Sequence, residues 1–432
     1  MRQVVVRCLA MLASAGIVAG CSQHAQSVLP AMSNSHALSI HNAQATPPPI
    51  TTTHVLTWDA LGSCCDTTTV TDAQAAVWLT WVMSSVNDSA GFQAAGIQTM
   101  YYTQPNRQAV GGPEYTSDTT TFAHDCNGNL IYDTKINPEE YLMQPSSTHL
   151  GQLWQANVQL ETVTDGGQFN AIYEDLTDTT IYMNTVPCDF EQTQWSAWSN
   201  SLTDYITSIG YPVIYNGLEA FGGTKTAPTV SATIAMNSST AGGMAEGCYS
   251  HTGKFQPVFE PDWSVMEDTE IQMGEADKLF FCRNMDTEGA KTAATGPRIY
   301  SYASFLLTYH LKSSVYADSY ETPDNFEELP EIELVPTGPV QSVPTDISGL
   351  EQTGGSYARQ FSDCYLAGNY VGPCAVVVNP NKNTVPWPYP ASEYTHTLVV
   401  SGQDIYDGGT ISTTGPPPPS TMPVLTADIV FP

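Results

Sequence analysis

The stretch FNAIYEDL, from Phe169 to Leu176, is a mostly apolar run that ends on two adjacent carboxylates, Glu174 and Asp175. Side chains alternate along a strand, so Tyr173 and Asp175 share one face while Glu174 lies on the other. We expect only one acid to point into a barrel, and we favour Asp175. Glu174 is expected to bond to a loop or to be solvated. The alternative for Asp175 is an ordinary N-cap or loop acid.

Seven further short runs of apolar or β-branched residues accompany this one, and several are separated by helical patterns. Eight strands that alternate with helices predict a (β/α)8 barrel. An irregular barrel or a doubly wound sheet is the alternative. The predicted strands are His54–Trp58, Gly96–Tyr102, Glu140–Gln144, Phe169–Glu174, Pro212–Asn216, Val230–Met236, Lys278–Arg283 and Ser314–Ser319.

Three apolar stripes at helical spacing predict amphipathic helices between the strands. The second stripe is followed by Gly210, a residue type that commonly ends helices. The stripes are Ala75, Leu79, Val82 and Val86; Trp195, Trp198, Leu202, Ile206 and Ile209; and Ile299, Tyr302, Leu306 and His310.

The character of the chain changes beyond Thr337. A segment rich in Pro, Gly and Ser is followed by the β-type runs CAVVVNP, YTHTLVVSG and ADIVFP. We therefore predict a barrel over residues 54–337 and a small β-sheet or β-sandwich domain over residues 338–432. Within CYLAGNYVGPC, Cys364 and Cys374 take opposed positions about a Gly-Asn turn, which predicts a disulfide between them.

The N-terminus predicts export. Arg2 and Arg7 precede an apolar run, as in a signal peptide over residues 1–20. Residues 18–21, VAGC, resemble the lipobox of bacterial lipoproteins, which predicts lipidation of Cys21 and a place in the cell envelope. A plain signal peptide that leaves Cys21 unmodified is the alternative. Residues 21–53 carry no charged side chain and predict a flexible tether.

Charge narrows the possible partners. The chain of 432 residues has 13 basic and 43 acidic residues and a net charge of −30, which disfavours nucleic acid and anionic lipid surfaces as partners. Contact with a membrane is expected through the lipid anchor only. No run after the signal peptide is long enough to predict a spanning helix.

Cysteine use agrees with export. Of the 10 cysteines, Cys8 leaves with the signal and Cys21 takes lipid, and the even number left favours disulfides. Zinc is disfavoured because the chain has no CxxC, no HExxH and no close pair of histidines. The segment DCNGNLIYD fits an Asn-Gly turn better than a calcium loop. We expect no metal and no cofactor, and the absence of GxSxG, Walker and GxGxxG motifs disfavours serine hydrolases and nucleotide enzymes.

Two carboxylates are the candidate catalytic pair. Active-site groups of (β/α)8 barrels lie where strands end, which suits Asp175. Glycosidic bond cleavage needs a second acid, and Glu246 in GGMAEGCYSH follows a predicted strand through small residues that allow a tight turn. Glu219 in YNGLEAFGG is the main competitor, and each of these glutamates could equally be a plain loop or helix acid.

Other strand ends carry side chains that suit sugars. Aromatic rings stack on the apolar faces of sugar rings, and amides and guanidinium groups bond to hydroxyls. Each residue taken singly is more often a core or loop residue. The candidate substrate-binding residues are Trp58, Asp59, Tyr101, Gln104, Asn216, Glu219 and Arg283, and Tyr102 and Asn284 lie beside two of them.

Seven segments of the chain, from FNAIYEDLTD to CAVVVNP, resemble the glycoside hydrolase-like TIM-barrel proteins of bacteria. The resemblance covers roughly residues 54–380 and implies a (β/α)8 fold and polysaccharide hydrolysis. It implies an Asp at the end of the fourth strand, matched by Asp175, and an acid after the sixth, matched by Glu246. The segments are FNAIYEDLTD, PVIYNGLEAFGG, GGMAEGCYSH, KLFFCRN, IYSYASFLLTYHL, GGSYARQF and CAVVVNP.

The sequence thus predicts a lipid-anchored extracytoplasmic glycoside hydrolase with a carbohydrate substrate and Asp175 and Glu246 as its acid and its nucleophile or base. One alternative is an envelope lipoprotein that binds glycan without cleaving it, in which the same acids are structural. A third possibility is an enzyme that acts on another carbohydrate bond.

Overall fold

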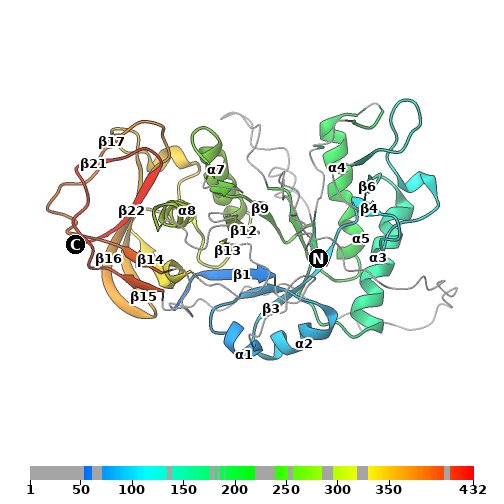
Figure 1. Cartoon of the computed structure of the whole chain (residues 1–432), viewed down its shortest axis with the longest axis horizontal. Coiled ribbons are helices and arrows are strands. Elements are labelled where there is room, and N and C mark those ends of the chain that lie inside the picture. The colour runs from blue at the N-terminus through cyan, green and yellow to red at the C-terminus, as the bar shows by residue number, and fades with distance from the viewer. Residues whose placement is uncertain are drawn as a thin grey trace, which may run out of the picture.

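A computed structural model shows a barrel with a β-rich C-terminal part (Figure 1). The residues that it describes are 53–60, 71–133, 139–175, 181, 185–188, 190–218, 239–251, 256–284, 295–318, 329–402 and 409–432.

Eight parallel strands close into a barrel, in which each strand pairs with its predecessor and its successor in the ring. Described helices follow six of the first seven strands, and the residues between β8 and β9 lie mostly outside the described part of the chain, so the predicted (β/α)8 fold is confirmed by the closed barrel and its helices. The strands are β1 Leu56–Ala60, β2 Trp81–Met83, β3 Gln98–Thr103, β7 Ala171–Glu174, β8 Val213–Asn216, β9 Gly242–Glu246, β12 Leu279–Asn284 and β13 Ser314–Asp318. The helices are α1 Asp72–Ala75, α2 Val86–Ala94, α3 Thr148–Gln159, α4 Gln192–Leu202, α5 Asp204–Thr207, α7 Asp262–Glu275 and α8 Thr295–Thr308.

Alternate side chains of the strands fill the barrel interior. Trp58, Met100, Tyr173 and Phe281 belong to one buried cluster there. The intervening side chains point outward against the helices, as Ile172 does in a separate cluster. In the strand before Asp175, side chains therefore alternate between the interior and the outer face of the barrel, as predicted.

Two of the predicted strands do not belong to the described barrel. Residues 140–142 do form a strand, β6, but it lies in a separate three-stranded sheet of order β4-β6-β5, with β4 at Arg107–Ala109 and β5 at Tyr132–Asp133. The predicted strand Val230–Met236 lies outside the described residues. The sixth barrel strand is instead β9, the GGMAE segment that we expected to be a turn.

The first apolar stripe was wrongly predicted to be one helix. Helix α1 ends at Ala75, and Val82 lies in strand β2. Ala75, Leu79 and Val82 nevertheless share a buried cluster, so their spacing reflects a common core rather than a common helix. The second stripe spans α4 and α5 and ends at Gly210, whose φ is +93°, and the third lies on α8 and the turn after it.

Glycine is required in β9 because the neighbouring strand approaches closely. A Cβ atom on Gly242 would lie 2.2 Å from the backbone oxygen of Leu279 in β12. We expect Gly242→Ala to lower the free energy of unfolding by about 1 to 3 kcal/mol or more, measured by chemical unfolding. Gly296→Ala in α8 is the control, because no atom lies within 4 Å of its added Cβ, and it should be neutral or slightly stabilising. An equal loss in both variants would contradict this explanation.

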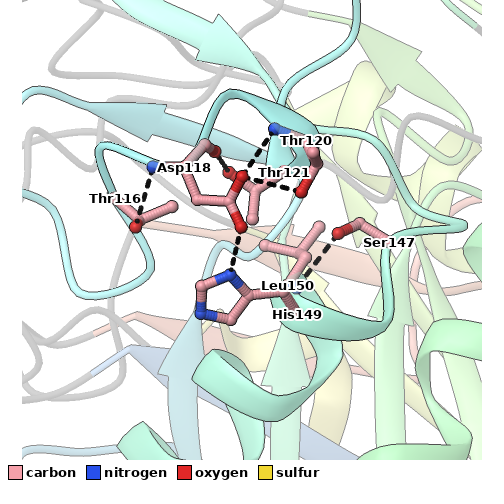
Figure 2. A network of polar contacts seen from close by, with 7 residues as sticks. All are labelled: Thr116, Asp118, Thr120, Thr121, Ser147, His149 and Leu150. Atoms are coloured by element: carbon pink, nitrogen blue, oxygen red, sulfur yellow. Dashed lines mark hydrogen bonds and ion pairs between the residues drawn. The ribbon is translucent and has the colours of Figure 1, made fainter.

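The sheet β4-β6-β5 is part of an insertion between β3 and β7, and Asp118 ties this insertion to α3 (Figure 2). One carboxylate oxygen of Asp118 accepts the N–H of Thr120 at 3.0 Å and caps the short helix η1, Thr119–Thr121. The other contacts Nδ1 of His149 in the first turn of α3 at 2.8 Å. The Thr120 N–H and the His149 ring lower the pKa of Asp118 to about 2, so this carboxylate stays ionised in all but strong acid.

The C-terminal part is an antiparallel sheet of order β14-β15-β16-β22-β18 that packs on α8 (Figure 1). Its apolar face joins the outer face of the barrel in one buried cluster. The sheet begins in β14, which crosses the predicted domain boundary between residues 337 and 338. Its strands are β14 Leu334–Pro339, β15 Tyr357–Leu366, β16 Asn369–Asn379, β22 Thr426–Phe431 and β18 His396–Thr397.

The described residues also form several smaller elements. They are the π-helical turn η2 Leu160–Thr164 after α3, the 3-10 helices η3 Pro330–Glu333 and η4 Ile347–Leu350, and three two-stranded sheets. These sheets pair β10 Ser250–His251 with β11 Gln256–Pro257, β17 Val385–Pro386 with β21 Thr421–Met422, and β19 Val399–Ser401 with β20 Thr410–Ser412.

The predicted disulfide between Cys364 and Cys374 is confirmed. It crosses the hairpin of β15 and β16, whose turn is Ala367 and Gly368, both with positive φ, rather than the expected Gly-Asn pair. Two further disulfides join Cys126 to Cys188 and Cys248 to Cys282. Cys21, Cys64 and Cys65 lie outside the described residues. Within the described part of the chain, no helix is both long and apolar enough to cross a membrane.

Candidate active site

Polar side chains from four neighbouring barrel strands meet at the carboxyl end of the barrel. Asn216 is the last residue of β8 and Glu246 the last of β9, while Arg283 is the next to last of β12. Asp175 directly follows β7, and its N–H continues the ladder by donating to the Thr103 oxygen of β3. In a parallel barrel these positions share one rim, which is where active sites of this fold lie.

Asp175 is held through both of its oxygens. The hydroxyl of Tyr102 donates to Oδ2 at 2.7 Å, and the Asn216 amide donates to Oδ1 at 2.8 Å. The side chain is buried, so neither oxygen depends on bulk water for its hydrogen bonds. Two such donors fix the orientation of the carboxyl group.

Glu246 is held by a cation and by the same amide. Arg283 Nη1 donates to Oε1 at 2.5 Å, and Asn216 Nδ2 donates to Oε2 at 3.0 Å. Because one nitrogen bonds to both acids, the nearest oxygens of Asp175 and Glu246 lie less than about 6 Å apart. The side chains of Arg283 and Glu246 remain 21% and 12% exposed, which leaves this end of the network in contact with solvent.

Stacked aromatic rings form the floor beneath the acids. Tyr173 stacks with Trp58 at 6.4 Å on one side and with Tyr102 at 6.1 Å on the other, and Arg283 lies 6.0 Å from the centre of the Trp58 ring. Burial and the nearby carboxylates raise the pKa of Tyr102 and of Tyr173 well above the usual value, so both phenols stay neutral. Trp58 is only 6% exposed and therefore supports the site from below.

Glu174 faces away from the barrel interior, as expected from the alternation. It is fully buried, and its Oε1 accepts the side-chain N–H of Asn106 in the loop after β3 at 2.8 Å. Burial raises the pKa of Glu174 to about 8, and the charge of Asp175 adds to this effect. Glu174 is therefore mostly protonated near neutral pH, and it points away from the barrel interior that Asp175 faces.

The remaining predicted substrate-binding residues divide into two groups. Gln104 lies beside the network, because the Tyr102 hydroxyl is 3.3 Å from its Oε1 and its amide donates to Glu140 of β6 at 3.1 Å. For Tyr101 and Asp59 the structure differs from the prediction, because both side chains lie on the outer side of their strands. Tyr101 points outward and packs on Phe169 at 5.2 Å.

Asp59 follows the inward-facing Trp58 and so lies on the outer face of β1, where its carboxylate accepts the N–H of Ala60 at 2.7 Å. Tyr102, the neighbour of Tyr101, takes the place predicted for Tyr101. Glu219 lies outside the described residues.

The disulfide between Cys248 and Cys282 lies beside the ion pair, a feature that the sequence analysis did not identify. Cys282 directly precedes Arg283, and Cys248 is two residues after Glu246. In the register of β9 and β12, Arg283 is paired with Glu246. The covalent link therefore fixes the two strand ends that carry the pair. Among the described residues, no cluster of three or more His, Cys, Asp or Glu side chains suits a metal ion.

No protein-family profile matches the chain, and no curated protein matches it. Solved structures that resemble the chain include the following three. Ega3 of Aspergillus fumigatus, solved with galactosamine, is 13% identical, with 64% of this chain and 94% of that one covered and a TM-score of 0.43. The maltogenic α-amylase AmyB of Thermotoga neapolitana is 8% identical, with 87% and 98% covered and a TM-score of 0.40.

A GH30 endoxylanase of Clostridium papyrosolvens is 9% identical, with 87% and 96% covered and a TM-score of 0.39. Similarities of this size say nothing about activity, so the function of this chain has to be argued from its own side chains.

Proposed function

We propose that the protein is a glycoside hydrolase that cleaves a polysaccharide or oligosaccharide with Asp175 and Glu246. The observation that carries the proposal is the Asn216 amide nitrogen, which bonds to both carboxylates and holds them at one rim of the barrel. Glycoside hydrolysis needs two such carboxyl groups, one that delivers a proton to the leaving oxygen and one on the other side of the scissile bond.

The separation of the two acids supports retention of configuration at the anomeric carbon. Carboxyl groups of retaining enzymes lie about 5 to 5.5 Å apart, whereas inverting enzymes need about 6.5 to 9.5 Å to admit a water molecule. The nearest oxygens of Asp175 and Glu246, which Asn216 holds less than about 6 Å apart, are closer together than the inverting range, and this favours the retaining mechanism.

In the proposed first step, one carboxylate attacks the anomeric carbon and forms an ester bond to the sugar. The other carboxyl group gives its proton to the glycosidic oxygen as the bond to the leaving sugar breaks. In the second step this group takes a proton from water, whose oxygen attacks the anomeric carbon and releases the first carboxylate. Arg283 holds Glu246 through their ion pair, and the neutral phenol of Tyr102 holds Asp175 in place.

The proposal is tested by the release of reducing ends from a panel of envelope and plant polysaccharides. We expect the wild type to release reducing ends from at least one of them and the double variant Asp175→Asn, Glu246→Gln to release none. Binding of a glycan without cleavage by the wild type would favour the alternative of a non-catalytic glycan-binding protein.

We further propose that the mature protein is extracytoplasmic and anchored by lipid at Cys21. Its three described disulfides support an oxidising compartment, and residues 18–21 support lipidation. Membrane fractionation of wild type and Cys21→Ala tests the anchor. Loss of Cys21→Ala from the membrane fraction, or its retention as an unprocessed precursor, is expected. An unchanged distribution of processed protein would contradict the proposal.

A further inference from the structure

A second group of buried acids lies away from the candidate active site, between α7, α8 and the C-terminal sheet. Glu267 and Glu270 are about one turn apart on α7, and both side chains are completely buried. Such positions are costly for carboxylates unless every charge and lone pair has a partner. The proposed hydrolysis uses neither residue.

A single hydroxyl contacts both carboxyl groups. Thr308 Oγ1, at the end of α8, lies 2.6 Å from Glu267 Oε2 and 3.1 Å from Glu270 Oε2. A hydroxyl has one hydrogen, so it makes a full hydrogen bond to both oxygens only if one of the carboxyl groups carries a proton and donates to the hydroxyl. With both acids ionised, the one hydrogen would have to be shared between two negatively charged oxygens. The geometry therefore favours one protonated acid in the pair.

The other contacts of the pair agree with one proton. The Tyr249 hydroxyl lies 3.3 Å from Glu270 Oε2, and the Oε1 atoms of both acids are buried without a hydrogen-bond partner among the described residues. An oxygen that is buried and unpaired costs more on an ionised carboxylate than on a neutral carboxyl group. A proton on the pair reduces this cost.

The charges around the pair allow one ionised carboxylate and disfavour two. Arg359 of β15 is the cation that faces it, and its guanidinium also donates to the Leu307 carbonyl of α8 at 3.0 Å. The negative charge of Asp268 on α7 raises the pKa of Glu267, whereas the Ser314 hydroxyl of β13 lowers the pKa of Glu270. The other titratable neighbours of the pair and of Arg359 are Tyr249, Tyr300, Tyr309 and His310.

Burial favours the neutral form of each of these four neighbours. Burial raises the pKa of each of the three tyrosines and lowers that of His310. Burial raises the pKa of Glu267 and of Glu270, and for Glu267 the charge of Glu270 adds to the effect. Because Arg359 is the cation that faces Glu267 and Glu270, the surrounding charges favour a single negative charge on the pair.

We propose that Glu267 and Glu270 share one proton in the folded protein and form a pH-sensitive contact that joins α7 and α8 to the C-terminal sheet beside Arg359. In the unfolded chain both acids ionise above about pH 4.5. The folded pair keeps its proton to a higher pH, so unfolding releases a proton in this window. The stability of the fold consequently falls as the pH rises from about 4.5 until the folded pair itself ionises.

Unfolding by denaturant at a series of pH values from about 5.5 to 7.5 tests the proposal. One shared proton makes the unfolding equilibrium constant rise by about tenfold per pH unit. We expect Glu267→Gln and Glu270→Gln each to remove this contribution, because the amide copies the neutral carboxyl group and leaves the other acid beside Arg359. The double variant should remove no more than either single variant.

A substitution of an exposed acid is the control for the pH slope of unfolding. Glu351→Gln, at an exposed position, should leave the pH slope unchanged. An unchanged slope in both single variants would overturn the proposal, and a double variant that removes twice as much would show two independent protons instead of a shared one. If one glutamine variant does not fold, the other still provides a test, because its unfolding near pH 7 must release about one proton fewer than that of the wild type, in which Glu174 also releases a proton. An equal release by the variant and the wild type would overturn the proposal.

Discussion

Asp175→Asn is expected to lower kcat for glycoside hydrolysis by at least about a hundredfold while the fold stays intact. The amide cannot take up or deliver the proton and cannot form the ester, so either role of Asp175 is lost. The fold should tolerate the change, because the Asn oxygen can accept the Asn216 N–H and the Tyr102 hydroxyl can turn to accept the new N–H. Initial rates and thermal unfolding of both proteins measure the two effects.

Glu174→Gln is the matched control for this prediction. Glu174 is adjacent in sequence, but it points to the other side of β7 and bonds to Asn106. Burial raises its pKa to about 8, so a neutral amide resembles its state at neutral pH. We expect its activity to stay within a few fold of the wild type. A loss as large as that of Asp175→Asn would mean that the two acids have been assigned to the wrong faces.

Glu246→Gln is expected to cause a loss of similar size on polysaccharide, again at least about a hundredfold. The substitution removes the charge that pairs with Arg283 and places an amide where both neighbours donate hydrogens. Thermal unfolding must therefore accompany the rate measurement, so that a loss of structure is not taken for a loss of chemistry.

The two amide variants should differ on an aryl glycoside whose leaving group needs no proton. The variant that lacks the proton donor keeps much of its first step on such a substrate, whereas the variant that lacks the nucleophile does not. The pair of rates then shows which acid is the proton donor and which is the nucleophile. Full activity of Glu246→Gln on polysaccharide would remove Glu246 from the mechanism and bring forward Glu219, the other candidate.

The barrel could be predicted from sequence because most of its strands are runs of buried apolar residues. Two barrel strands, β2 and β9, were not predicted, and each omission has a physical reason. Strand β2 has only three residues, too few to show a period, and its apolar neighbours imitate a helical stripe. Strand β9 begins with two glycines, which propensity assigns to a turn, although the close approach of Leu279 requires a residue without a side chain at Gly242.

The site was predictable where it depends on the local alternation of side chains and not where it depends on neighbours in space. Asp175 follows from the period of its own strand. Tyr101 was chosen in place of Tyr102 because a shift by one residue exchanges the two faces of a strand. The bridge through Asn216 and the pairing of Arg283 with Glu246 follow only from the order and register of β7, β8, β9 and β12, which the sequence alone does not supply.

Proton NMR of the first products released by the wild type tests the central claim most directly. The enzyme is incubated with the polysaccharide panel, and the anomeric signals of the new reducing ends are followed before mutarotation. Two carboxyl groups whose nearest oxygens lie less than about 6 Å apart predict new reducing ends with the same anomeric configuration as the bond that was cleaved. Products of inverted configuration would contradict the proposed mechanism, and no cleavage of any polysaccharide or aryl glycoside would contradict the assignment of Asp175 and Glu246 as a catalytic pair.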